Sequence, residues 1–455
     1  MKIKQFKITD DFPSTPFNIQ FSRPVTPDHN FFSILIGANG TRKSRTLRDI
    51  LDIASRMIAR ESMEHKNKAG QLELWGNARN TRSIRKIIAL SGVATDRFPS
   101  RLTLHRKSSL PDLYSYIGPR TDNNLVSRVQ SINRVALGLL QASSSIRQRS
   151  RALAALLKVL GSFDYIEFTF KVHDDLQGGL SELQIQNRLR KINMGHRGFY
   201  WDEQRTRPLL PKIVEIVGNR SPAKLRVDVH PAVTIKTNGD IDALELLASS
   251  GLLTVDSGNI GNSSKGVSHS LSELSSGQWH MLSSLLFTAA SVEDDTLMLV
   301  DEPENSLHPA WQQQYLGLLS EMIDGVKGVH VMVATHSPLI AASLPPLRCE
   351  VIQIRESRAR LVARALPSGP FGWTADQILK DVFNLSSTRS LDFSKEMDIA
   401  LRHFGAGDRD NPKLVTAVNS LVTLKAGLPE DDLARSVIDT LSSVVLRGSS
   451  SGRGG

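Results

Sequence analysis

Continuous apolar runs alternate with amphipathic segments along most of this chain. Each run is short and ends at glycine or at polar residues, which is typical of strands buried on both faces of a parallel sheet. Apolar residues at helical spacing follow the run at 31–36 and precede the run at 296–302, so helices are predicted at both places. Four buried strands are predicted in this way, at 31–36, 85–92, 296–302 and 328–336. The alternation predicts an α/β fold built around a mixed β-sheet core.

Weaker patterns fill the rest of the chain. Residues 123–158 have the spacing of two helices, and everything from Trp373 onward is predicted to be helical. Thr374 and Gln377 form a capping box before an apolar run. Further strands, singly or in pairs, are predicted at 3–21, 113–120, 166–173, 225–240 and 349–366.

Changes in these patterns suggest five segments. The stretch 256–266 is rich in Gly, Ser and Asn and is predicted to be a loop, the clearest internal breakpoint. The last residues contain nothing that could form a core, and we expect them to be disordered. The predicted division is 1–122, 123–265, 266–366, 367–446 and a tail at 447–455.

Composition narrows the class of protein. Of 455 residues, 40% are hydrophobic, which is enough for a sizeable core. The net charge of +10 favours nucleic acid or a nucleotide as partner, although many soluble proteins are basic without one. One cysteine, Cys349, excludes an internal disulfide and suits a reducing compartment. No run approaches the roughly 20 apolar residues of a membrane span, and no signal peptide begins the chain. We therefore expect a cytoplasmic protein.

The first buried strand runs into GANGTRKS, which has the spacing of a phosphate-binding loop between a strand and a helix. In such a loop the backbone N–H groups cradle phosphates, the lysine reaches the β- and γ-phosphates, and the serine holds Mg²⁺. Arg42 replaces an expected glycine, so it either strains the loop or adds a positive charge. The predicted ATP-binding residues are Gly37, Ala38, Asn39, Gly40, Thr41, Arg42, Lys43, Ser44 and Arg45.

Two further buried strands end in groups suited to phosphate chemistry. TLMLVDEPE ends in Asp301, predicted with Ser44 to be a magnesium ligand, and in Glu302, predicted to polarise the attacking water. His336 follows the next strand and is placed to contact the γ-phosphate. An acidic turn and a structural histidine are the simpler interpretations.

A fourth motif, LSSGQ, precedes a predicted helix, and small residues at a helix start favour anions. Its residues are Leu274, Ser275, Ser276, Gly277 and Gln278. The order GANGTRKS, LSSGQ, LVDEPE and THSP resembles the ATP-binding-cassette ATPases. DEPENSLHP and the gap of more than two hundred residues between Lys43 and LSSGQ resemble the non-transporter AAA branch. That branch includes chromosome-maintenance, RecF-like and overcoming-lysogenization-defect proteins.

The resemblance implies a P-loop ATPase head that uses ATP and Mg²⁺ and forms a homodimer around the nucleotide. It covers 1–120 and 265–365 well, as two ATPase lobes that flank an insertion, or lid. Ser275, Ser276, Gly277 and Gln278 would contact the nucleotide of the opposite subunit, with Glu302 and His336 catalytic. Asn305 and Ser306 would lie in the loop that links the two sites. Proteins of this family carry a glutamine before the helical insertion. Its equivalent is not identifiable in this sequence, although Gln71 lies in the corresponding region.

The rest of the chain offers no second active site. After His336, the only acidic cluster that resembles part of a nuclease site is EDD at 430–432. It is predicted to lie in a helical region, whereas a nuclease site would place such residues on a strand. Arginines and aromatics interleave at 187–208, which suits nucleic acid or merely a solvated basic face. We expect an ATPase that regulates a separate effector, a nuclease or toxin, in anti-phage defence. A weakly hydrolysing scaffold that sequesters such a partner, and a DNA-repair ATPase, are the alternatives.

Overall fold

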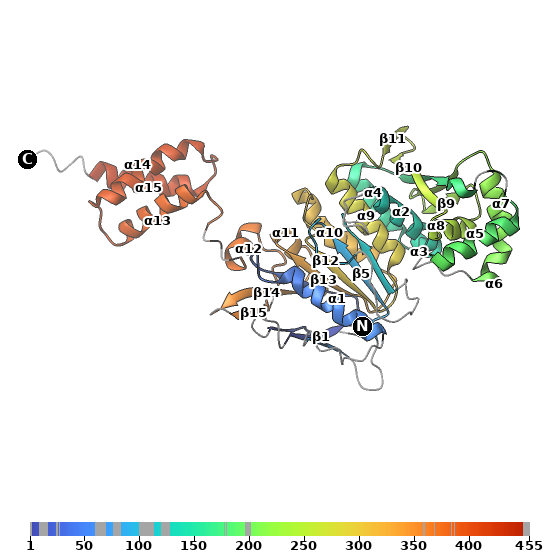
Figure 1. Ribbon diagram of the computed structural model, residues 1–455. Coiled ribbons are helices and arrows are strands. Elements are labelled where there is room, and N and C mark those ends of the chain that lie inside the picture. The colour runs from blue at the N-terminus through green and yellow to red at the C-terminus, as the bar shows by residue number, and fades with distance from the viewer. Residues whose placement is uncertain are drawn as a thin grey trace, which may run out of the picture. The chain divides into compact units, whose positions relative to one another are not determined.

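The computed structural model divides the chain into two compact units, Met1–Trp373 and Thr374–Gly455. Each unit has its own hydrophobic core, and Figure 1 shows the helices and strands of both units. The residues that the structure describes are 2–8, 17–23, 26, 28–59, 70–75, 83–99, 113–119, 128–176, 178, 180–195, 202–357, 360–367, 369–383, 385 and 387–448.

A seven-stranded sheet forms the centre of the first unit, in the order β15-β14-β3-β13-β12-β5-β6. All neighbouring pairs are parallel except β14 and β15. This sheet confirms the α/β prediction and the predicted buried strands, because every residue of β3, β12 and β13 is buried. The strands are β3 (Phe31–Ile36), β5 (Lys86–Ser91), β6 (Tyr114–Ile117), β12 (Thr296–Asp301), β13 (His330–Thr335), β14 (Cys349–Ser357) and β15 (Arg360–Ala365).

Helix α1 (Lys43–Ala59) packs on β12 and β13, and α9 (Ser276–Ser291) packs on β5 and β6. On the side of α1, a small antiparallel sheet in the order β2-β1-β4 completes one hydrophobic core with Leu47, Ile50 and Leu299. Its strands are β1 (Ile3–Ile8), β2 (Phe17–Gln20) and β4 (Gly70–Leu74). Gln71 lies exposed on β4 opposite Lys7, and so on an antiparallel strand rather than in a loop after the parallel strands.

The segment between the two halves of the large sheet carries an antiparallel sheet in the order β11-β10-β7-β8-β9. Helices pack beside it, and the longest described helix here has 14 residues, so the described residues contain no coiled-coil arm. The strands are β7 (Tyr165–Val172), β8 (Ala223–Asp228), β9 (Thr234–Thr237), β10 (Leu253–Asn262) and β11 (Val267–Ser270). The helices are α2 (Arg128–Gln141), α3 (Ser143–Gln148), α4 (Ser150–Gly161), α5 (Glu182–Gly195), α6 (Glu203–Thr206), α7 (Leu210–Gly218) and α8 (Ile241–Ser249).

The predicted loop at 256–266 is wrong, since most of it belongs to the β10–β11 hairpin. Gly266 lies in the turn with a φ of 63°, whereas the two glycines of β10 serve close packing. A Cβ on Gly258 would lie 2.6 Å from Leu271, and one on Gly261 would lie 2.2 Å from the Val267 carbonyl oxygen. Glycine in a strand marks such close approaches as well as turns.

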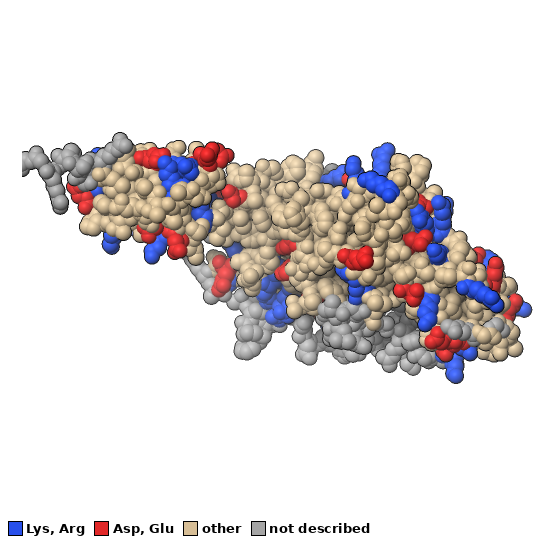
Figure 2. Space-filling view, turned by 90° about the horizontal axis from the view of Figure 1, so that it is seen from above, with Lys and Arg blue, Asp and Glu red and all other residues tan. Residues whose placement is uncertain are grey.

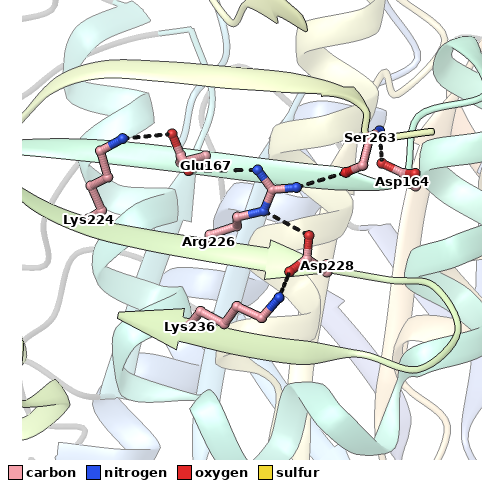
Figure 3. A network of polar contacts seen from close by, with 7 residues as sticks. All are labelled: Asp164, Glu167, Lys224, Arg226, Asp228, Lys236 and Ser263. Atoms are coloured by element: carbon pink, nitrogen blue, oxygen red, sulfur yellow. Dashed lines mark hydrogen bonds and ion pairs between the residues drawn. The ribbon is translucent and has the colours of Figure 1, made fainter. Parts of the chain in front are cut away.

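One face of this five-stranded sheet carries a self-compensating charge network (Figure 3). Arg226 donates to Asp228 at 2.8 Å and to Ser263 at 2.8 Å, and its guanidinium lies 3.8 Å from the centre of the Tyr165 ring. Lys236 pairs with Asp228 at 2.9 Å, and Lys224 pairs with Glu167 at 3.4 Å. Because each of these cations faces a carboxylate, the face presents little net charge.

In the second unit, α13, α14 and α15 enclose a separate core. Among the described residues after Trp373 the regular structure is helical, as predicted, and the capping box of Thr374 and Gln377 is present. Among the described residues, no helix is long and apolar enough to cross a membrane. The helices of this unit are α12 (Ala375–Asp381), α13 (Leu391–Gly405), α14 (Pro412–Leu424) and α15 (Leu433–Gly448). The first unit also contains α10 (Pro309–Met322) and α11 (Pro338–Ala341).

A buried ion pair ties the small sheet to the large one. Lys2 Nζ lies 3.4 Å from Glu350 Oε1 and 3.3 Å from the centre of the Phe31 ring. Glu350 also accepts hydrogen bonds from Ser33 Oγ at 2.7 Å and from the Ser22 backbone at 2.8 Å. Burial lowers the pKa of Lys2 to about 8. The carboxylate therefore compensates a cation that would otherwise be costly inside the protein.

We predict that Glu350→Ala destabilises the first unit by about 3–5 kcal/mol, because a buried cation loses its partner. Chemical denaturation followed by tryptophan fluorescence measures this loss. Glu356→Ala, on the exposed end of the same strand, is the matched control and should change stability little. Equal stability of the two variants would contradict the structural role given to the pair.

Candidate functional site

Three of the four motifs predicted from the sequence meet at one edge of the large sheet. Strands β3, β13 and β12 are parallel neighbours, so the loops that follow them leave from the same edge. Asp301 is the last residue of β12, His336 directly follows β13, and Lys43 begins α1 after the loop that follows β3. The site therefore follows directly from the order of the strands.

The loop after β3 has the backbone that phosphate binding needs. Gly40 has a φ of 82°, and a Cβ on Gly37 would lie 2.1 Å from the Ile354 carbonyl oxygen, so each position requires glycine. Lys43 Nζ folds back and donates to the carbonyls of Gly37 at 2.8 Å and Ala38 at 3.1 Å. Ala38, Asn39 and Gly40 are exposed. An anion could replace these carbonyls as the partner of the lysine.

Arg42 adopts a φ of 66°, the left-handed conformation that glycine would occupy without strain. Its side chain is buried, and Nη2 lies 3.6 Å from Asp49 Oδ2 on α1. The positive φ is the conformation that the strain interpretation requires, whereas the ion pair with the following helix was not anticipated. Thr41 closes the turn by donating to the Ala38 carbonyl at 2.8 Å, and half-buried Arg45 follows in the first turn of α1.

Asp301 ends β12 in a buried position and faces the loop after β3. Burial, followed by the nearby carboxylates, raises its pKa to about 7 although Ser44 donates a hydrogen bond to it. Asp301 Oδ1 has no hydrogen-bond partner among the described residues. A carboxylate oxygen that lacks a partner, beside a serine hydroxyl, is a donor set suited to Mg²⁺. The residues therefore fit the ion, whose charge would relieve the electrostatic cost of burying Asp301.

Glu302 and His336 form a chain of contacts with Lys43. His336 Nε2 lies 3.4 Å from Glu302 Oε1, and Lys43 Nζ lies 3.2 Å from His336 Nδ1. Burial and the neighbouring ammonium lower the pKa of His336. A neutral ring that carries its proton on Nε2 satisfies both contacts, because Nδ1 then accepts from the lysine. Burial also lowers the pKa of Lys43 to about 8, against the pull of the three neighbouring carboxylates.

Glu304 is a member of this site that the sequence analysis did not single out. The backbone N–H of His336 donates to Glu304 Oε1 at 2.6 Å, and burial raises the pKa of this carboxyl. Glu304 thus ties the loop after β12 to the loop after β13. Its place two residues after Glu302 in DEPE is the only signal that could have identified it.

The loop that leaves Asp301 is tightly packed on its neighbours. Asn305 Nδ2 donates to the Gly92 carbonyl at 2.6 Å, and a Cβ on Gly92 would lie 2.2 Å from the Glu302 carbonyl oxygen. Glu302 and Ser306 have φ values of 47° and 66°. Strained backbone at several points is typical of functional loops.

The LSSGQ motif forms the N-terminus of α9. Ser275 is its N-cap and makes a reciprocal capping box with Gln278. Ser275 and Ser276 are exposed, whereas Gly277 is buried, and a Cβ there would lie 2.2 Å from the Ser306 carbonyl oxygen. Gln278 also donates to the Leu160 carbonyl at 3.1 Å. The exposed start of this helix is free to receive an anion.

Comparison with known proteins gives partial matches. Residues 170–342 match the family described as "AAA domain, putative AbiEii toxin, Type IV TA system". Septu protein PtuA of Bacillus thuringiensis is 30% identical over 112 residues, which cover 22% of this chain and 27% of that protein. Protein ea59 of Escherichia phage lambda is 32% identical over 120 residues, which cover 26% of this chain and 22% of that protein. The matched region thus spans less than a third of each of these relatives.

Two solved structures contain Smc heads, and both are 12% identical to this chain. The head with an extended coiled coil bound to the C-terminal domain of ScpA, derived from Pyrococcus furiosus, has a TM-score of 0.33 over 80% of this chain and 96% of that one. The Smc head bound to the C-winged helix domain of ScpA has a TM-score of 0.30 over 80% and 98%. Scores this low add nothing to what the sheet order and the family model establish. The sheet order and the motifs agree with the match of residues 170–342 to this AAA domain family.

Proposed function

We propose that the protein hydrolyses ATP to ADP and phosphate in a site that two copies of the chain complete together. The observation that carries this proposal is the chain of contacts from Lys43 through His336 to Glu302, beside the buried carboxylate of Asp301. An ammonium, a magnesium-binding carboxylate and a polarising carboxylate are the groups that phosphoryl transfer to water requires.

Each of these groups would have a separate task. Lys43 would exchange its two carbonyl partners for the β- and γ-phosphates, while Ser44 and Asp301 would hold Mg²⁺. Bound Mg²⁺ would neutralise charge that develops on the phosphates. Glu302 would orient the attacking water, and His336 would donate from Nε2 to the γ-phosphate once that phosphate draws the ring away from Glu302.

The second half of the site would come from another copy of the chain. Ser276 and the other exposed residues at the start of α9 would contact the γ-phosphate of the partner's nucleotide. The close approach of Gly277 to the Ser306 carbonyl supports a link between the two sites of such a dimer, since Ser306 follows Glu302 in the chain. ATP binding would therefore favour the dimer, and hydrolysis would release it.

We infer that this cycle regulates a separate effector, a nuclease or toxin, in defence against phage. The resemblance of the motifs to anti-phage ATPases, the similarity to Septu protein PtuA and the family's description as a toxin–antitoxin type support this role. A scaffold that hydrolyses ATP weakly is the second candidate, and the left-handed Arg42 favours it.

Direct binding of nucleic acid has less support. On the face drawn in Figure 2, Lys and Arg side chains are interspersed with Asp and Glu rather than gathered into one patch. In the predicted basic segment, Arg190 pairs with Glu203 at 2.8 Å, while its aromatic residues at 199–201 lie outside the described residues. A DNA-repair role would need a more continuous basic surface.

We predict that Glu302→Gln lowers ATP turnover by about 100-fold or more, because the group that orients water is lost. ATP binding should persist, since Lys43 and Asp301 remain. Phosphate release and equilibrium binding of a fluorescent ATP analogue measure the two quantities. Glu321→Gln, on an exposed position of α10, is the control that should behave as wild type. Undiminished turnover in Glu302→Gln would refute the catalytic assignment.

Arg42 offers a second test. We predict that Arg42→Gly leaves turnover within about threefold of wild type, because the arginine pairs with Asp49 rather than with phosphate. Thermal unfolding should shift down by several degrees, since buried Asp49 loses a cationic partner. The double variant Arg42→Gly/Asp49→Ala should recover part of that shift. A tenfold rise in KM for ATP in Arg42→Gly would instead make Arg42 a phosphate ligand.

A further inference from the structure

We infer that Arg128, at the start of α2, is a positioning residue that holds the LSSGQ loop in the shape that contacts the partner subunit's ATP. The inference rests on the proposed two-copy site. Arg128 belongs to the insertion between the two halves of the sheet, so through this residue the insertion contacts the proposed site directly. Arg128 lies more than 140 residues before the loop in the sequence.

One guanidinium serves three carbonyls of this loop. Arg128 Nη1 donates to Ser272 at 2.7 Å, and Nη2 donates to Leu274 at 2.9 Å and to Ser275 at 3.4 Å. The planar fork of an arginine can bind several acceptors at once, which the single ammonium of a lysine does less well. These carbonyls lie just before the first turn of α9, so the contact fixes the path by which the chain enters that helix.

The same side chain also reaches the helix itself. The Arg128 guanidinium lies 5.6 Å from the centre of the Trp279 ring, one turn into α9. Arg128 thus contacts both the loop before Ser276 and the helix after it. The exposed residues that would meet the nucleotide are held between these two contacts.

Helix α2 packs against both the five-stranded sheet and α9, so a displacement of the sheet would also displace α2. The Val255 backbone on β10 donates to Asn133 Oδ1 at 2.6 Å, which joins α2 to the five-stranded sheet. Gly138 allows close packing on α9, since a Cβ there would lie 3.2 Å from Ala290 Cβ. A ligand that displaced this sheet or α2 would move Arg128, and with it the LSSGQ loop. The insertion is thereby placed to control hydrolysis at a distance from Glu302.

Because the loop would act on the partner's nucleotide, loss of Arg128 should damage the opposite site and spare its own P-loop. We predict that Arg128→Ala lowers kcat by about tenfold or more, as expected when charge-assisted hydrogen bonds are removed. Its affinity for a fluorescent ATP analogue should stay within about twofold of wild type, because the P-loop is intact. The kcat of Arg128→Lys should lie between those of wild type and Arg128→Ala. Arg151→Ala, which removes an exposed arginine on α4, should have the kcat of wild type.

Mixing of variants separates a role on the partner's site from a merely structural one. Glu302→Gln alone and Arg128→Ala alone should each retain about a tenth of wild-type turnover or less, while both still bind ATP. An equal mixture should regain about a quarter of wild-type turnover, because half of the dimers are mixed and each keeps one intact site of two. Ser276→Arg mixed with Glu302→Gln is the reference pair, since Ser276→Arg disrupts the motif itself.

Each outcome has a definite meaning. Recovery in both mixtures supports the positioning role. Recovery in the reference mixture alone would overturn the inference about Arg128 while leaving the two-copy site intact. No recovery in either mixture would overturn the two-copy site, and the role of Arg128 with it. Wild-type kcat in Arg128→Ala would also reject the inference.

Discussion

Three carboxylates crowd the buried end of β12, and one ammonium from another strand's loop faces them. Asp301, Glu302 and Glu304 all pull on Lys43, and burial shifts the pKa values of Asp301 and Lys43 to about 7 and about 8. Such an assembly is costly unless opposite charges meet. The parallel order β3-β13-β12 makes that meeting possible, because it brings loops from distant parts of the chain to one edge. Much of the fold can be understood as support for this edge.

The sequence was informative where chemistry and local pattern coincide. The buried strands that precede Lys43 and His336, and the one that ends in Asp301, could be predicted, since apolar runs and the polar residues after them are both local signals. The β10–β11 hairpin was missed because Gly258 and Gly261 were taken as turn residues, although they serve strand packing. The roles of Glu304 and Arg128 depend on contacts with residues remote in sequence, and the Arg42–Asp49 pair depends on a side-chain direction. No single-sequence pattern encodes these contacts.

Two tight contacts organise the proposed cycle. Gly277 meets the Ser306 carbonyl, so the helix that would receive the partner's phosphate lies against the loop that carries Glu302. Glu304 accepts from the His336 backbone, so that loop also sets the position of the histidine. A change at the start of α9 can therefore reach Glu302 through the backbone of this loop, and His336 through the Glu304 carboxylate. The insertion is tied to the same helix through Arg128 and Leu160, which gives a route from an external signal to hydrolysis.

The central claim is that ATP holds two copies of this chain together. Sedimentation velocity on the Glu302→Gln variant with Mg²⁺ and ATP measures this most directly, since bound ATP then persists. The account predicts dimers with ATP, monomers with ADP, and monomers in both conditions once Lys43→Ala is added. A sedimentation coefficient that does not change with the nucleotide, in a variant shown to bind ATP, would contradict it.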